Sequence, residues 1–136
     1  MAPRTMVSKL QLLVPFMVVF LLASSMRVNA QLTCQTSGGS PLAVDADNCV
    51  NYLIGKGNTE CCQNNCAGPD ACTNMCSSGT AATDICGNCG QCVPCQQAGN
   101  YLANIIENCE SAVDGLVGGY IFGFTNPTVN VNVYHT

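Results

Sequence analysis

The sequence predicts an α+β fold: a small disulfide-rich α/β-sandwich with two helices and a mostly antiparallel sheet. Two segments repeat apolar residues at helical spacing, and several short segments bounded by Gly, Asn and Pro have strand character. Twelve cysteines follow residue 30, which is 11% of the remaining 106 residues and exceeds the ~8–10% that marks a disulfide scaffold. The expected order of elements is roughly β–α–β–β–β–α–β–β.

The first thirty residues have the pattern of a secretory signal peptide. Two basic residues precede the apolar stretch Leu10–Ala23, and Val28-Asn29-Ala30 supplies the small residues of a cleavage site. The apolar stretch contains a proline and is fourteen residues long, whereas a membrane-spanning helix needs ~20 residues. We therefore expect residues 1–30 to be a signal peptide and residues 31–136 to be one secreted, extracellular domain without stable membrane insertion.

Two helices are predicted in the secreted part. The first begins at Ser40-Pro41, an N-cap followed by proline at the first helical position, and ends at Gly55. The second has Asn100 as its cap and Gly115 as its stop. The apolar positions that define the two buried faces are Leu42, Ala46, Cys49, Val50, Leu53 and Ile54, then Tyr101, Leu102, Ile105, Ile106, Cys109 and Val113. Four acidic residues are expected on or near the solvent faces as solvated charges, namely Asp45, Asp47, Glu107 and Glu110.

The clearest strand lies at the C-terminal end. Valines at 129, 131 and 133 alternate with Asn130, Asn132 and Tyr134, a period of two that places one face on a core. Leu116–Phe124 is the expected antiparallel partner, joined through Thr125-Asn126-Pro127. Gly118-Gly119 within it indicates a bulge or a close backbone approach.

Shorter strands and a turn are expected between the two helices, where the sequence is rich in Gly, Asn and Pro. The strand candidates are Thr59–Gln63, Thr80–Cys86 and Gln91–Cys95, and Asn64–Asp70 is the expected turn.

The cysteines admit a metal interpretation and a disulfide interpretation. The even spacing of Cys86, Cys89, Cys92 and Cys95 is close to that of iron–sulfur and zinc sites. An oxidising compartment, an even cysteine count and a single histidine, His135, favour disulfides, with no metal or other cofactor. The twelve candidates are Cys34, Cys49, Cys61, Cys62, Cys66, Cys72, Cys76, Cys86, Cys89, Cys92, Cys95 and Cys109. Their pairing is open, except that the adjacent Cys61 and Cys62 should bind different partners.

The charges exclude one class of function. After residue 30 there is one basic residue, Lys56, against eight acidic residues, a net charge of −7. Binding of nucleic acid needs clustered Lys and Arg, so it is excluded. Lys56 itself is expected to be a solvated residue in a Gly-Lys-Gly turn.

Residues for catalysis are few. His135 stands one residue from the end, and the sequence holds neither a G-x-S-x-G elbow nor an H-E-x-x-H motif. We therefore expect a protein that is not an enzyme and has no catalytic residues.

The chain resembles the killer-toxin-like superfamily in several segments taken together. These are TSGGSPLAVDADNCVNYLIGKG, the adjacent cysteine pair, GTAATDICGNCGQCVPC, GNYLANIIENC, LVGG and the terminal TVNVNVYHT. That group includes the calcium-channel-blocking killer toxin of smut fungi, secreted necrosis-inducing effectors of fungal plant pathogens, and moss homologues. The resemblance implies an α/β-sandwich with several disulfides and a role in antagonism or host interaction. The central cysteine run is richer than the family pattern.

Two function hypotheses follow, and a third is weaker. The first is a secreted toxin-like or effector protein of virulence, a monomer that binds an unidentified cell-surface or membrane protein. The second is a secreted structural or stress-related cell-wall protein without toxin activity. The third is a metal-binding protein that uses the central cysteines.

Overall fold

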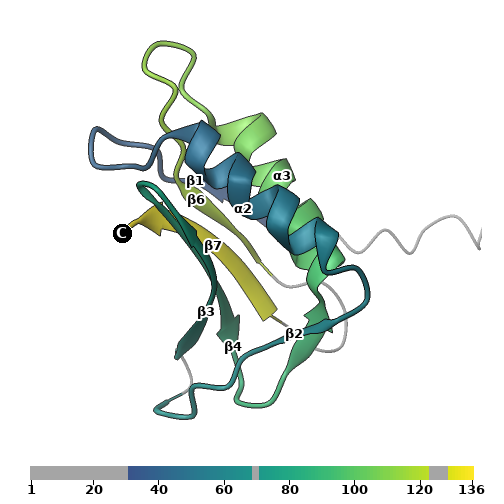
Figure 1. The fold of residues 1–136 in the computed structure, drawn as a ribbon. Coiled ribbons are helices and arrows are strands. Elements are labelled where there is room, and N and C mark those ends of the chain that lie inside the picture. Colours follow the sequence, from purple (N-terminus) through teal and green to yellow (C-terminus); the bar gives the residue numbers. More distant parts are fainter. Residues whose placement is uncertain (1–30, 69–70, 123–128) are drawn as a thin grey trace, which may run out of the picture.

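Two helices lie side by side against one face of a five-stranded antiparallel sheet, and a two-stranded ribbon adjoins them (Figure 1). The computed structural model describes residues 31–68, 71–122 and 129–136. The α+β prediction is confirmed, because these residues form two helices, a mostly antiparallel sheet and six disulfides. The sheet order is β1-β6-β7-β4-β3, with β2-β5 as the ribbon. The elements are β1 (Gln31–Cys34), α2 (Ala43–Gly55), β2 (Glu60–Cys62), β3 (Cys72–Ser78), β4 (Ala81–Gly87), β5 (Cys92–Pro94), α3 (Cys95–Cys109), β6 (Gly119–Phe122) and β7 (Val129–His135).

Helix α2 begins two residues later than the sequence predicts and ends where expected. The expected cap, Ser40, instead accepts a hydrogen bond from the Ser37 N–H through its Oγ, at 2.9 Å. Leu42 stays extended because it bridges to Leu116 and donates its N–H to Thr80 Oγ1 at 2.9 Å. These tertiary contacts override the Ser-Pro start, so that Leu42 is the cap.

Helix α3 differs from the prediction at both ends. It begins at Cys95 rather than at Asn100, because the Cys61–Cys95 disulfide and a 2.7 Å bond from the Cys95 N–H to Thr59 O fix the first turn. It ends at Cys109 rather than near Gly115. The chain then turns outward, and Val113, expected on the buried face, is 96% exposed.

Strand β7 confirms the predicted alternation. Its three valines are 3%, 0% and 4% exposed, whereas Asn130 and Asn132 are half-buried and Tyr134 is exposed. Strand β6 pairs with it antiparallel, as expected, with Ile121 opposite Val131. The predicted turn at 125–127 lies outside the described residues.

The glycine pair before β6 confirms the expected close approach. A Cβ on Gly118 would lie 2.7 Å from Ser40 Oγ, and one on Gly119 would lie 2.5 Å from Thr33 O. Only glycine lets the start of β6 run this close to Thr33 of β1 and to Ser40 in the segment that follows β1.

Strand β3 was not predicted, and it is the additional strand in the order of elements. It is an edge strand with a bulge between Asn74 and Cys76, and none of its residues is fully buried. Its sequence therefore lacks the alternation that revealed β7. Strands β2, β4 and β5 lie within one residue of the predicted ranges, and residues 64–68 of the predicted turn form a loop without regular structure.

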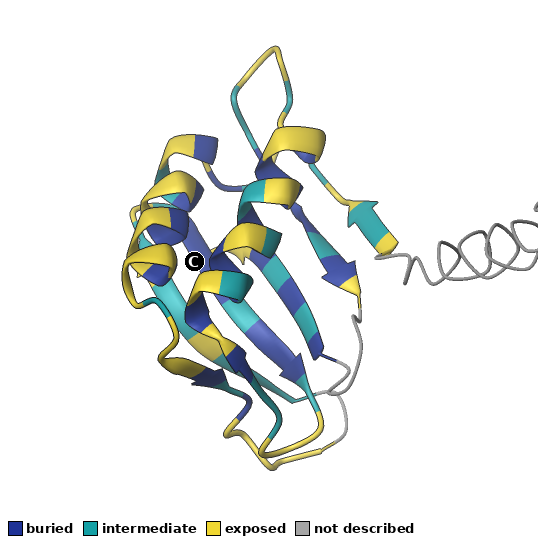
Figure 2. Cartoon of the chain, turned by 90° about the vertical axis from the view of Figure 1, so that its right-hand side faces the viewer, coloured by how far each residue is buried: buried dark blue, intermediate teal, exposed yellow. Residues whose placement is uncertain are grey.

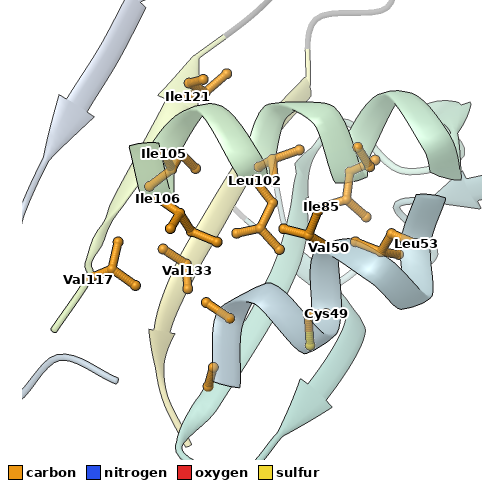
Figure 3. Close-up of a cluster of buried hydrophobic side chains, with 14 of the residues drawn as sticks. Cys49, Val50, Leu53, Ile85, Leu102, Ile105, Ile106, Val117, Ile121 and Val133 are labelled. Carbon is orange, nitrogen blue, oxygen red and sulfur yellow. The ribbon is translucent and has the colours of Figure 1, made fainter. Parts of the chain in front are cut away.

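The core fills the space between the helices and the sheet (Figure 3). Leu53, Leu102, Ile105, Ile85 and Val131 are fully buried there. Figure 2, seen from the helix side, shows buried residues on the inner sides of both helices and on the strands behind them. No helix among the described residues is long and apolar enough to cross a membrane.

Candidate functional site

The central cysteines form a ladder of four nested disulfides. The evenly spaced run pairs in reverse order with earlier cysteines, in the bridges Cys72–Cys86, Cys66–Cys89, Cys62–Cys92 and Cys61–Cys95. Two of these bridges join register partners, one in β3–β4 and one in β2–β5. The adjacent cysteines 61 and 62 have different partners, as their adjacency requires. Antiparallel pairing of the two segments thus determines the connectivity that spacing left open.

A buried glutamine fills the loop inside this ladder. Gln63 is 0% exposed, and its Nε2 donates to Asn65 O at 2.8 Å and to Ala71 O at 2.5 Å. Its Oε1 accepts from the Thr73 hydroxyl and from the Asn65 N–H. A single side chain therefore satisfies several main-chain groups that would otherwise be buried without partners. No sequence pattern predicts this role of Gln63.

Two further disulfides connect helices to strands. Cys34–Cys109 ties β1 to the end of α3, and Cys49–Cys76 ties α2 to β3. All twelve cysteines are thereby paired.

Within the part of the chain that the structure describes, one group has donor atoms close enough to hold a metal ion, namely Glu60, Cys62 and Cys92. The two cysteines are bonded to each other, and a disulfide sulfur is not the thiolate that zinc or iron–sulfur sites require. With this bridge intact, the group offers a metal one carboxylate and no thiolate.

A groove between α2 and β3 is the candidate binding site. It has a volume of about 330 Å³ and is lined by Asn48, Tyr52, Met75, Cys76, Ser77 and Ser78. Its two sides are bonded to each other through Cys49–Cys76. The groove exists because β3 is the edge of the sheet, so no further strand of the described chain covers it. Tyr52 is 51% exposed, which leaves a large aromatic ring available to a partner.

The one basic residue after residue 30 stands beside this groove. Lys56 is exposed, as predicted, and its Nζ lies 4.7 Å from the centre of the Tyr52 ring. Such a cation–π contact at an exposed site is worth about 0.5–1 kcal/mol. The contact therefore places Lys56 at the rim of the groove, beside the exposed Tyr52 ring.

Asp45 differs from the prediction of a solvated charge. Its Oδ2 accepts the Thr80 N–H at 2.8 Å and the Thr80 hydroxyl at 2.7 Å, and these two bonds lower the pKa of Asp45. Gly79 has a φ of 51°, and a side chain there would collide with the Asp45 carboxylate. Asp45 therefore joins the β3–β4 turn to the first turn of α2.

A second polar cluster lies on the sheet face away from the helices. The Tyr134 hydroxyl donates to Asp84 Oδ1 at 2.9 Å, and Asn74 Nδ2 donates to the same oxygen at 3.1 Å. Partial burial, the hydrogen bond and the Asp84 charge together raise the pKa of Tyr134. His135 is exposed, with its Nδ1 2.8 Å from Thr136 O.

Comparison of the chain with protein-family models and with curated proteins gave no match.

Proposed function

We propose that the chain is a secreted, cysteine-rich protein of the toxin or effector type that acts by binding a cell-surface or membrane protein without catalysis. The observation that carries this proposal is the α2–β3 groove. It presents an exposed tyrosine, a methionine and small polar side chains between walls that share a disulfide.

The composition of the groove favours a protein partner. Tyrosine and methionine are enriched in protein interfaces, whereas Lys, Glu and Asp are depleted at interface centres. None of the six lining residues is charged. The disulfide between the walls reduces the conformational entropy that binding would otherwise cost.

Two features of the sequence support secretion and antagonism. The predicted signal peptide and the six disulfides are typical of proteins that pass through an oxidising compartment. The resemblance to the killer-toxin-like superfamily supports a role against other cells.

The contact does not depend on imitation of a cation. A net charge of −7 after residue 30 opposes binding to an anionic channel mouth or lipid surface. Lys56 is also engaged with Tyr52. We therefore expect the aromatic ring, rather than the ammonium group, to make the essential contact.

The test applies purified secreted protein to fungal cells and to plant tissue. Intact mass first verifies that six disulfides have formed, because their reduction adds twelve hydrogens. Tyr52→Ala should lower activity about tenfold or more, whereas Lys56→Ala should retain it and added calcium should not compete. Val113→Ala, in the exposed loop after α3, is the matched control.

Three results would contradict the proposal. Loss of all activity in Lys56→Ala would show that the Lys56 ammonium group imitates a cation at the target. Turnover of a glycan, lipid or peptide would make the protein an enzyme. A correctly bridged wild type that affects no cell would leave the structural or stress-related cell-wall role.

A further inference from the structure

We infer that the sheet face opposite the helices is a second binding surface, which takes a neutral cell-wall polysaccharide. This inference concerns a different part of the molecule from the α2–β3 groove and goes beyond the function proposed above.

The topology leaves this face open. Both helices lie on one side of the sheet in Figure 1, and no helix of the described residues covers the other side. The odd valines of β7 point into the core, so its even-numbered residues point to the open face. The register places Phe122 of β6 opposite Asn130, and Tyr120 opposite Asn132.

Three aromatic residues form a line on this face. Phe122 and Tyr120 are two residues apart on β6. Tyr134 lies on the neighbouring strand β7, two residues beyond Asn132, which is the partner of Tyr120. At ~3.4 Å per residue the line extends roughly 14 Å along the strands. Phe122 is 47% exposed and Tyr134 is 42% exposed, so this is an uncovered aromatic surface rather than part of the core.

The aromatic line runs beside amides. Asn130 and Asn132 stand opposite two of the rings, and Asn74 lies beyond Asp84 on the edge strand. Asn130 Oδ1 is the only buried side-chain oxygen or nitrogen of the described residues that has no hydrogen-bond partner. Because this oxygen is buried, only the exposed remainder of the half-buried Asn130 side chain can reach a ligand.

This chemistry matches a sugar polymer better than other ligands. A sugar ring offers an apolar C–H face that packs on an aromatic ring, and hydroxyls at its rim that bond to amides. Among the described residues, Asp84 is the only charged side chain that the register places on this face, and Tyr134 and Asn74 already bind it. The face has no Lys or Arg for phosphate or sulfate. Aromatic residues are also enriched at protein interfaces, but here asparagines rather than Met or Arg stand beside the rings.

Sedimentation with insoluble polysaccharides tests the inference. Secreted wild-type protein is mixed with chitin, cellulose, β-1,3-glucan and mannan, and the bound fraction is measured at about 0.1 M and 1 M salt. We expect at least one polymer to retain the protein, with little dependence on salt, because the contact involves no ion pair. The double variant Phe122→Ala/Tyr134→Ala should bind about tenfold more weakly. Tyr52→Ala, which removes an exposed ring from the groove, is the matched control and should bind normally.

A second measurement does not rely on variants. Soluble fragments of the retained polymer are titrated into wild-type protein, and backbone amide shifts are followed by NMR. Shifts confined to β6, β7 and β4 support the inference, and shifts confined to α2 and β3 overturn it. Equal binding by the double variant, binding that high salt abolishes, or no binding to any polymer also overturns it. Because Tyr52 and the sheet aromatics are tested separately, failure of this inference is distinct from failure of the groove proposal.

Discussion

Replacing Val131 with aspartate tests the central packing of the fold. Val131 is 0% exposed on β7, between Ile121 of β6 and Ile85 of β4, which are 2% and 0% exposed. An aspartate there would have to be neutral, which at pH 7 costs about 4 kcal/mol, from a reference pKa of ~3.9 and 1.36 kcal/mol per unit. Loss of the buried valine costs about 1.5–3 kcal/mol more. The sum approaches the whole ~5–15 kcal/mol stability of a domain, so secretion should fail.

Secretion yield and chemical unfolding are measured for Val131→Asp and for Phe122→Asp. Phe122→Asp, on the open face of β6, is the control, because Phe122 is 47% exposed. Asn130 and Asn132 are less suitable, because Asn130 Oδ1 is buried without a partner and Asn132 lies opposite Asp84 and would create a like-charge pair. Near pH 4 the cost of neutralising the aspartate almost vanishes, so refolded Val131→Asp should regain about 4 kcal/mol relative to pH 7. Equal behaviour of the two variants, or a defect of Val131→Asp that is the same at both pH values, would refute the assignment of β7 faces.

Two further predictions concern the disulfides and the helix start. With the other bridges in place, Cys66–Cys89 closes a loop of about nine residues and Cys34–Cys109 closes a loop of about forty residues. Removal of Cys34–Cys109 should therefore lower the free energy of unfolding by about 1 kcal/mol more than removal of Cys66–Cys89. Both Cys66 and Cys89 are exposed, so mild reductant followed by alkylation and mass mapping should label them first. The folded-state pKa of Asp45 is lowered, so its contribution is present above the unfolded value and is lost as the pH falls through the folded value. Asp45→Asn should therefore weaken the loss of unfolding free energy on the acid side of the pH profile. An unchanged profile would contradict a stabilising role for the hydrogen bonds between Thr80 and Asp45.

Elements with one buried face were predictable, and elements whose ends depend on distant contacts were not. The alternating valines of β7 predict a strand with one face on the core, so this strand and its partner β6 were predicted from the sequence. Helix α3 begins at Cys95 after Pro94, without a Ser, Thr, Asp or Asn cap, and Gly99 lowers the helical propensity of its second turn. Gly99 has a packing role instead, since a Cβ there would lie 2.9 Å from Ile54 Cγ1, so the bare backbone lets α3 approach α2.

The candidate groove could not be predicted either, because it depends on contacts between distant segments. One wall is visible in the sequence, because Asn48 and Tyr52 are four residues apart on the outer face of α2. The other wall is β3, whose edge position removes the pattern that would identify it. The nested pairing of cysteines was likewise hidden, because it follows from the antiparallel course of two segments rather than from their spacing.

The fold explains how one small chain can carry two separate contact surfaces. A two-layer sandwich has only one buried face on its sheet, so the opposite face is free to carry side chains that the core does not need. Here those side chains are rings and amides, while the groove lies at the edge where α2 meets β3. The disulfides do much of the stabilising that a larger core would otherwise provide. A polysaccharide contact on the open face would hold the protein at a cell wall and leave the groove directed toward a second partner. The two proposals therefore predict independent losses, in which the sheet aromatics affect retention on the polymer and Tyr52 affects the response of the cell.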